Sequence, residues 1–160
     1  MNEIEIKIRI KVFKHLHELK PVDEALMQAA KRALSNSYSP YSAFKVAAAV
    51  LLENGEILTG TNQENASFPA GICAEGTVLS AVSAIHPGVA IKKMAVTVKN
   101  LRQVTNYPVS PCGICRQRIL EYETRFNNNI EIIMMGEEGE VYAVNSIKDL
   151  LPLHFSKADL

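Results

Sequence analysis

Three cysteines and one glutamate supply the residue types in this chain that could hold a metal ion and move protons. Cys73 and Glu75 stand two residues apart, and Cys112 and Cys115 form a Cys-x-x-Cys pair further along the chain. The two sulfurs of such a pair can reach the same tetrahedral ion, but the remaining ligands must come from elsewhere. Cys73 is the one cysteine left to supply a third sulfur.

Both cysteine motifs stand at predicted helix starts, where unpaired N–H groups lower the pKa of a thiol and favour the thiolate that binds zinc. Three protein ligands leave the fourth position of Zn²⁺ open for water. Zinc lowers the pKa of that water toward about 7, and a carboxylate nearby can take its proton and deliver it to a leaving group. We therefore predict one catalytic Zn²⁺ per chain with Cys73, Cys112 and Cys115 as ligands. Glu75 is the predicted proton carrier.

Each part of this pattern also has an ordinary structural explanation. A glutamate in the first turn of a helix often only complements the helix dipole, and single buried cysteines are commonly small core residues. A Cys-x-x-Cys pair can also be a redox pair, although that leaves Cys73 and Glu75 without a role. Spacing alone leaves these alternatives open.

The composition is that of a folded protein without a charge preference. Hydrophobic residues make up 48% of the 160 residues, which is enough apolar content for a core. Seventeen basic residues balance seventeen acidic ones, so no long-range positive field attracts a phosphate backbone. We expect a small neutral ligand and no nucleic acid polymer.

No apolar run approaches the roughly 18 residues of a membrane span, and no basic segment leads into an apolar stretch at the N-terminus. We therefore expect a cytoplasmic protein with no membrane partner. Thiols are kept reduced in that compartment, which leaves metal binding or burial as their use.

Apolar patterning indicates which elements must position these residues. Residues 3–13 alternate between aliphatic and charged residues, as in a half-buried strand at the edge of a sheet. Asn54-Gly55 between two apolar runs predicts a hairpin with a type I′ turn, in which both residues have positive φ. The predicted elements, in chain order, are a strand over 3–13, a helix over 23–37, strands over 44–52 and 56–60, a helix over 73–85, a strand over 92–98, a helix over 112–126, strands over 130–135 and 141–144, and a short helix that ends at 150–152.

This order of elements favours the α/β class. We expect a three-layer α/β/α sandwich around a mixed five-stranded sheet, with the N-terminal strand added to it. No internal repeat or linker divides the chain. Residues 1–160 are therefore predicted to form a single domain, of which residues 1–20 are an N-terminal extension.

Five short motifs, in order, resemble the small cytidine deaminase family over about residues 25–160. The motifs are Y-S-A-F (41–44), N-Q-E-N-A-S-F (62–68), C-A-E (73–75), S-P-C-G-I-C-R-Q (110–117) and L-L-P-L-H-F (150–155). The resemblance implies the cytidine deaminase-like fold and a homotetramer. It also implies a zinc hydrolase of pyrimidine salvage that converts cytidine or deoxycytidine to uridine or deoxyuridine and releases ammonia.

The resemblance assigns roles to residues that spacing does not single out. It implies that Asn62 and Glu64 hold the ribose hydroxyls, and that Phe44 flanks the pyrimidine ring together with Phe155 from a neighbouring subunit. The other implied positions are Ala74, whose backbone faces the base, Ser110, which lies near the departing ammonia, and Tyr41 and Phe68, which lie at subunit contacts.

Gly76 is the largest departure from the family pattern, because relatives usually have arginine directly after C-A-E. Three thiolates and one Zn²⁺ carry a formal charge of about minus one, and this excess weakens the metal as a Lewis acid. Relatives offset it with two arginines near the sulfurs, of which we expect only Arg116 to remain here. The departure leaves open a slower cytidine deaminase, a deaminase of a related amino-heterocycle such as blasticidin S or a modified nucleoside, and a catalytically weak nucleoside-binding relative.

Overall fold

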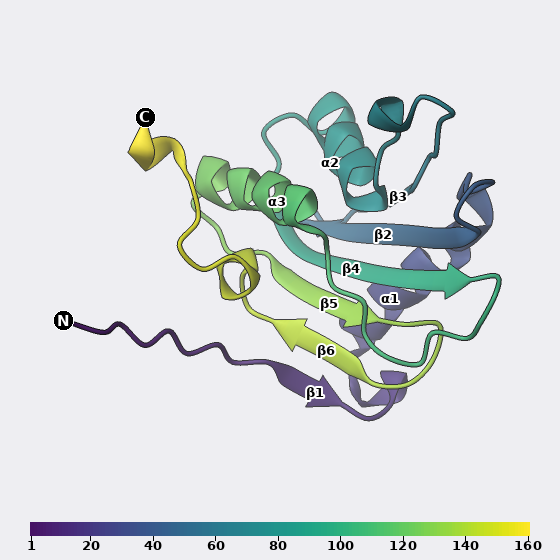
Figure 1. The fold of residues 1–160 in the computed structure, drawn as a ribbon, viewed down its shortest axis with the longest axis horizontal. Coiled ribbons are helices and arrows are strands. Elements are labelled where there is room, and N and C mark those ends of the chain that lie inside the picture. Colours follow the sequence, from purple (N-terminus) through teal and green to yellow (C-terminus); the bar gives the residue numbers. More distant parts are fainter.

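A six-stranded mixed sheet runs through the centre of the computed structural model, which describes residues 1–160 (Figure 1). The strand order is β1-β6-β5-β4-β2-β3, and only β4 and β5 are parallel. The helices and strands are β1 (Lys11–Phe13), α1 (Pro21–Ala33), β2 (Phe44–Leu52), β3 (Ile57–Thr61), α2 (Ala74–Ile85), β4 (Ile91–Asn100), α3 (Gly113–Phe126), β5 (Glu131–Met135) and β6 (Val141–Val144). None of the helices has the length and hydropathy that a membrane crossing requires.

Helices cover both faces of the sheet, which confirms the predicted three-layer sandwich. α2 and α3 lie side by side on one face, and α1 lies on the other (Figure 1). Successive strand residues face opposite layers. In β5, Ile132 packs under α2 and α3, whereas Ile133 packs under α1. The middle residues of the central strands are therefore mostly apolar, because both of their faces are buried.

The predicted N-terminal strand is wrong over most of its length. Only residues 11–13 form β1, which pairs antiparallel with β6 from Lys11 opposite Ala143 to Phe13 opposite Val141. β6 ends at Val144 and the chain turns into a short helix, so residues 3–10 have no strand beside them. Alternation showed that this segment suits a strand, but it carried no information on whether a partner exists.

The Asn54-Gly55 hairpin is confirmed, but its predicted turn type is wrong. Gly55 has φ of 89°, whereas Asn54 has negative φ. Gly55 N donates to Leu52 O at 3.1 Å, and Leu52 N donates to Glu56 O at 2.9 Å. The loop is therefore one residue longer than a type I′ connection and needs the left-handed conformation only at the glycine.

A buried glutamate fixes the C-terminal half of α3. Glu123 is 2% exposed. Its Oε1 accepts from the backbone N–H groups of Ile130 at 2.8 Å and Ile147 at 3.0 Å, and its Oε2 accepts from Ser146 Oγ at 2.7 Å. One carboxylate thus ties α3 to the start of β5 and to the helix after β6. Because three donors satisfy it, its burial is tolerated.

We expect Glu123→Gln to lower the free energy of unfolding by about 1 to 3 kcal/mol. Both carboxylate oxygens of Glu123 accept hydrogen bonds, and glutamine would replace one of them with an NH₂ group that faces a donor. Urea unfolding measures the change. Glu121→Gln on the exposed side of the same helix is the control and should stay within about 0.5 kcal/mol of wild type. Equal effects at the two positions would contradict the structural role of Glu123.

Candidate metal centre

The starts of α2 and α3 bring the two cysteine motifs together. Cys73 is the N-cap residue of α2, and Cys112 is the N-cap residue of α3. Both are the last extended residues before their helices, so their side chains lie beside the free N–H groups of the first turn. Cys73 Sγ accepts from Gly76 N at 3.3 Å in this way. The predicted helix starts are correct to within one residue.

A close approach between β3 and α2 sets the position of Cys73. A Cβ atom at Gly60 would lie 2.5 Å from Val78 N and 2.8 Å from Ala74 O. Only a residue without a side chain allows this contact between strand and helix backbones. The start of α2 is thereby held against the sheet.

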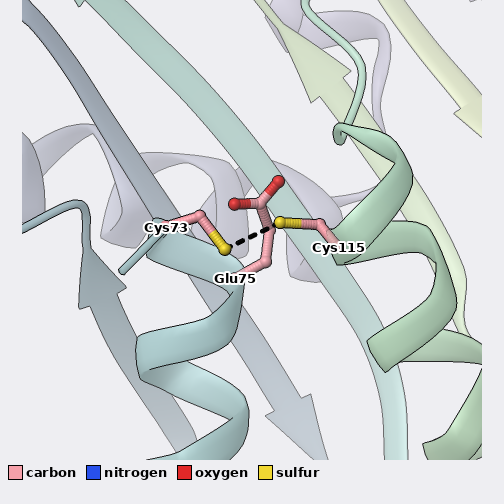
Figure 2. A group of neighbouring side chains, drawn as sticks. All are labelled: Cys73, Glu75 and Cys115. Carbon is pink, nitrogen blue, oxygen red and sulfur yellow. Dashed lines mark hydrogen bonds between the residues drawn. The ribbon is translucent and has the colours of Figure 1, made fainter. Parts of the chain in front are cut away.

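Three potential ligands converge between the two helices (Figure 2). One ligand atom each from Cys73, Glu75 and Cys115 lies within 4.8 Å of the others. The Sγ atoms of Cys73 and Cys115 are 2.8 Å apart, and those of Cys112 and Cys115 are 3.6 Å apart. Cys115 is buried, Cys73 is half-buried and Cys112 is exposed. The structure therefore gathers Cys73, Glu75 and Cys115 most tightly, with Cys112 beside Cys115.

The donor set fits Zn²⁺. Thiolates are preferred ligands of this ion, and Zn–S bonds of about 2.3 Å in a tetrahedron hold sulfurs about 3.8 Å apart. The separation of Cys112 and Cys115 is close to that value, whereas Cys73 and Cys115 must move apart by about 1 Å.

The two closest sulfurs are joined by a hydrogen bond, in which Cys115 donates to Cys73. A hydrogen bond from Cys115 lowers the pKa of the Cys73 thiol to about 7, against the effect of burial, and the same bond raises the pKa of Cys115. The N–H of Gly76 and the guanidinium of Arg118 also lower the pKa of Cys73. The surroundings of Cys73 therefore favour the thiolate that a metal requires.

Glu75 is not an exposed partner of the helix dipole. It is 4% exposed, and neither lysine, arginine nor histidine lies within 4.0 Å of its carboxylate. Burial raises the pKa of Glu75, and hydrogen bonds with the two thiols offset this rise only in part. A buried carboxyl group with a raised pKa can both take up and release a proton near neutral pH.

A cavity of about 200 Å³ opens onto these groups. Phe44 and Ser110, which the family resemblance singled out, line it together with the cysteines and Glu75. Val46 on β2, Val96 on β4 and Val109 in the loop before α3 also line it. They were missed because an apolar valine in the sequence is indistinguishable from a core residue. Its wall is therefore mostly apolar, with the polar groups gathered at the metal centre.

Asn62 lies behind this cavity and binds the strand that carries Phe44. Its Oδ1 accepts from Val46 N at 2.8 Å, and its Nδ2 donates to Phe44 O at 2.9 Å. An amide nitrogen has two hydrogens, so one remains for another acceptor.

Glu64 lies on a second groove, of about 480 Å³, that Tyr41 and Phe68 also line. Its carboxylate accepts from Tyr41 N at 2.9 Å and Ser42 N at 3.3 Å. Hydrogen bonds at Ser42, and then at Tyr41, lower the pKa of Glu64. The rings of Tyr41 and Phe68 meet edge to face at 6.0 Å, and both side chains are exposed.

Two further predicted residues do not line the cavity of their own chain. Ala74 is fully buried in the first turn of α2. Phe155 is 58% exposed on the C-terminal segment, where its carbonyl oxygen accepts from Gln117 Nε2 at 2.9 Å. A single chain therefore leaves the predicted contact of Phe155 with the ring unmade.

The arginines differ from expectation. Arg116 donates to Pro111 O, Leu150 O and Ser110 Oγ rather than to a cysteine. Arg118 is the arginine whose charge acts on Cys73. The expectation that only Arg116 remains near the sulfurs is therefore wrong, because Arg118 reaches them from α3 across the space that Gly76 leaves.

Residues 20–127 match the family model described as the cytidine and deoxycytidylate deaminase zinc-binding region. The chain belongs to this family. It is 38% identical over 137 residues to a cytidine deaminase of Sporosarcina psychrophila, covering 86% of this chain and 93% of the relative. It is 33% identical to a cytidine deaminase of Halalkalibacterium halodurans, covering 86% and 96%.

The fold agrees with this membership. The crystal structure of cytidine deaminase from Burkholderia pseudomallei superposes with a TM-score of 0.71 at 36% identity, covering 82% of this chain and 97% of that one. The resemblance seen in the sequence motifs is confirmed. The chain is a hydrolytic deaminase of the zinc-dependent class, and its cofactor is Zn²⁺.

Serine substitutions of the cysteines distinguish two ligand sets. We expect the purified protein to hold about one Zn²⁺ per chain, and Cys73→Ser and Cys115→Ser to lose it after dialysis, measured by metal analysis. If the ligands are the three cysteines, Cys112→Ser should lose zinc as well, and Glu75→Gln should keep it. Full retention of zinc by Cys112→Ser would assign the third position to Glu75 instead.

Proposed function

We propose that this protein hydrolyses cytidine and deoxycytidine to uridine and deoxyuridine with release of ammonia. The observation that carries the proposal is the buried Glu75 carboxylate, which lies beside the sulfurs of Cys73 and Cys115 at one cavity and has no basic partner. This carboxylate does not take part in a structural ion pair. It is suited to exchange protons with a water and a substrate in that cavity.

The residues divide the chemistry between them. Cys73, Cys112 and Cys115 would hold Zn²⁺, which supplies a Lewis acid that makes a water acidic near neutral pH. Glu75 would take one proton from this water as the water oxygen attacks C4 of the cytosine ring. Glu75 would pass this proton to N3. It would then take the remaining proton from the new C4 hydroxyl and pass it to the amino group, so that C4=O forms, the C4–N bond breaks and ammonia leaves.

The size of the cavity supports binding of the base alone. Pockets for drug-sized ligands are about 300–1,000 Å³, whereas this cavity is about 200 Å³. We infer that the pyrimidine ring enters beside Phe44, with Ser110 and the backbone of Ala74 near its polar edge. The sugar then lies outside, where the free N–H of Asn62 and the anionic Glu64 would bind its hydroxyls.

We also propose that the active form is a homotetramer in which Phe155 closes the cavity of a neighbouring chain. Support comes from the exposure of Phe155 and from its absence from the cavity of its own chain. Tyr41 and Phe68 form an exposed aromatic pair suited to a subunit contact. The proposed setting is pyrimidine salvage in the cytoplasm.

Deamination of a different amino-heterocycle is the second candidate, because Gly76 departs from the family pattern. Gly76 lines a surface groove together with Arg118, whereas the residues of the cavity do not include it. Its position therefore supports an effect on charge at the cysteines more than a reshaped pocket for another base.

Ammonia release, together with the ultraviolet change of the base, tests the proposed activity. Purified protein is offered cytidine, deoxycytidine, cytosine, adenosine and blasticidin S. We expect turnover of cytidine or deoxycytidine. Turnover of blasticidin S alone would favour the second candidate, and zinc-bound protein inactive on all five would contradict both.

We expect Glu75→Gln to retain zinc and fold but to lose about 10²- to 10⁴-fold in kcat, because the amide cannot carry the proton. Metal analysis and urea unfolding verify that the site and the fold survive. Activity within a few-fold of wild type in zinc-loaded Glu75→Gln would remove this residue from the mechanism.

Mixed assemblies test the role of Phe155. We expect Phe155→Ala and Glu75→Gln to be impaired separately, and a mixture refolded together to regain activity. Some cavities in such a mixture combine an intact Glu75 with an intact Phe155 from the other chain. A mixture no more active than the sum of the two variants, with mixed oligomers verified, would contradict a shared site.

A further inference from the structure

Gly76 on α2 and Arg118 on α3 share one space beside the metal centre. A Cβ atom at Gly76 would overlap Arg118 Nη1, and it would lie 3.1 Å from Cys73 Sγ and 3.2 Å from Ile72 Cγ1. The guanidinium therefore lies over the bare backbone of the first turn of α2. The sulfur of Cys73 lies on the other side of the position that a Cβ atom of residue 76 would occupy.

The position of Arg118 follows from helix periodicity. Arg118 comes three residues after Cys115, and residues at this spacing lie on the same side of a helix. As α3 brings Cys115 to Cys73, it also brings the guanidinium to Gly76. A side chain at position 76 would exclude it, so the absence of one is what admits Arg118.

Arg118 has no other partner for its charge. It forms no ion pair with a carboxylate within 4.0 Å, and its guanidinium donates no hydrogen bond within the chain. Arg116 differs, because three hydrogen bonds hold it on Pro111, Leu150 and Ser110. Of the two arginines, only Arg118 acts through its charge on a cysteine, and this cysteine is Cys73.

The metal centre requires such a cation. Three thiolates and one Zn²⁺ sum to a formal charge of about minus one, and the carboxylate of Glu75 adds another negative charge nearby. Excess negative charge makes the ion a weaker Lewis acid and raises the cost of holding three thiolates together. A guanidinium beside one sulfur offsets both effects.

We propose that Arg118 is a positioning residue of the zinc site, which uses the space left by Gly76 to balance the charge of the Cys73 thiolate and hold this ligand for the metal. The proposal rests on the proposed assignment of Cys73 as a ligand. It makes Gly76 and Arg118 a functional pair in which one guanidinium, supplied from either helix, satisfies the site.

Two substitutions of Arg118 by side chains of similar length distinguish the effect of its charge from the effect of its packing. We expect Arg118→Met to lower zinc affinity about 10- to 100-fold, the effect typical of groups that support metal ligands, and Arg118→Lys to retain most of it. Affinity is measured on the intact protein by competition with a chromophoric zinc chelator, and kcat with cytidine is measured at saturating zinc. Arg125→Met at the far end of α3 is the control, because Arg125 lies over Phe126 and away from the cysteines.

Moving the arginine from position 118 to position 76 gives the decisive result. Gly76→Arg alone places two guanidinium groups in one space, so we expect no gain in zinc affinity. The double variant Gly76→Arg with Arg118→Met should recover zinc affinity to within a few-fold of wild type. A merely structural role for Arg118 would not produce this recovery.

The proposal is overturned if Arg118→Met binds zinc as tightly as wild type, if Arg118→Lys loses as much as Arg118→Met, or if the double variant shows no recovery. A wild-type protein without zinc affinity would overturn the metal-site assignment and this inference together. Normal zinc affinities in a protein that turns over no nucleoside would overturn only the proposed function.

Discussion

The meeting of two helix starts on one face of the sheet is the constraint on which the rest of the site depends. Each helix begins at a cysteine, so the chemistry exists only while α2 and α3 lie side by side. Gly60 holds α2 against β3 by direct backbone contact, and Glu123 holds α3 through hydrogen bonds at its other end. The two supports differ in kind, one steric and one electrostatic, but each fixes a helix that carries a ligand.

Local features of this protein could be predicted from sequence, because they depend on neighbours along the chain. The starts of α2 and α3, the long strand β2 and the chemistry of cysteine beside Glu75 were of this kind. Features set by partners in space could not be predicted. β1 is short because β6 ends early, Val96 belongs to the core and also lines the cavity, and the closest sulfur to Cys73 is that of Cys115.

The arginines show the same limit at the level of one side chain. The motif around Cys115 singled out Arg116, yet the structure commits its guanidinium to backbone carbonyls and a hydroxyl. Arg118, which no motif marked, lies beside Gly76. A missing side chain is visible in a sequence, but what fills its space is decided by the packing of another element.

The shortness of β1 has a consequence for how the molecule behaves among its own copies. Beyond the three residues paired with β6, each isoleucine from Ile4 to Ile10 lies between charged neighbours. These charges oppose the addition of a strand from another molecule unless that strand carries opposite charges in register with them. The sheet therefore ends in a segment that suits a strand by its pattern and whose charges restrict which strands can add to it.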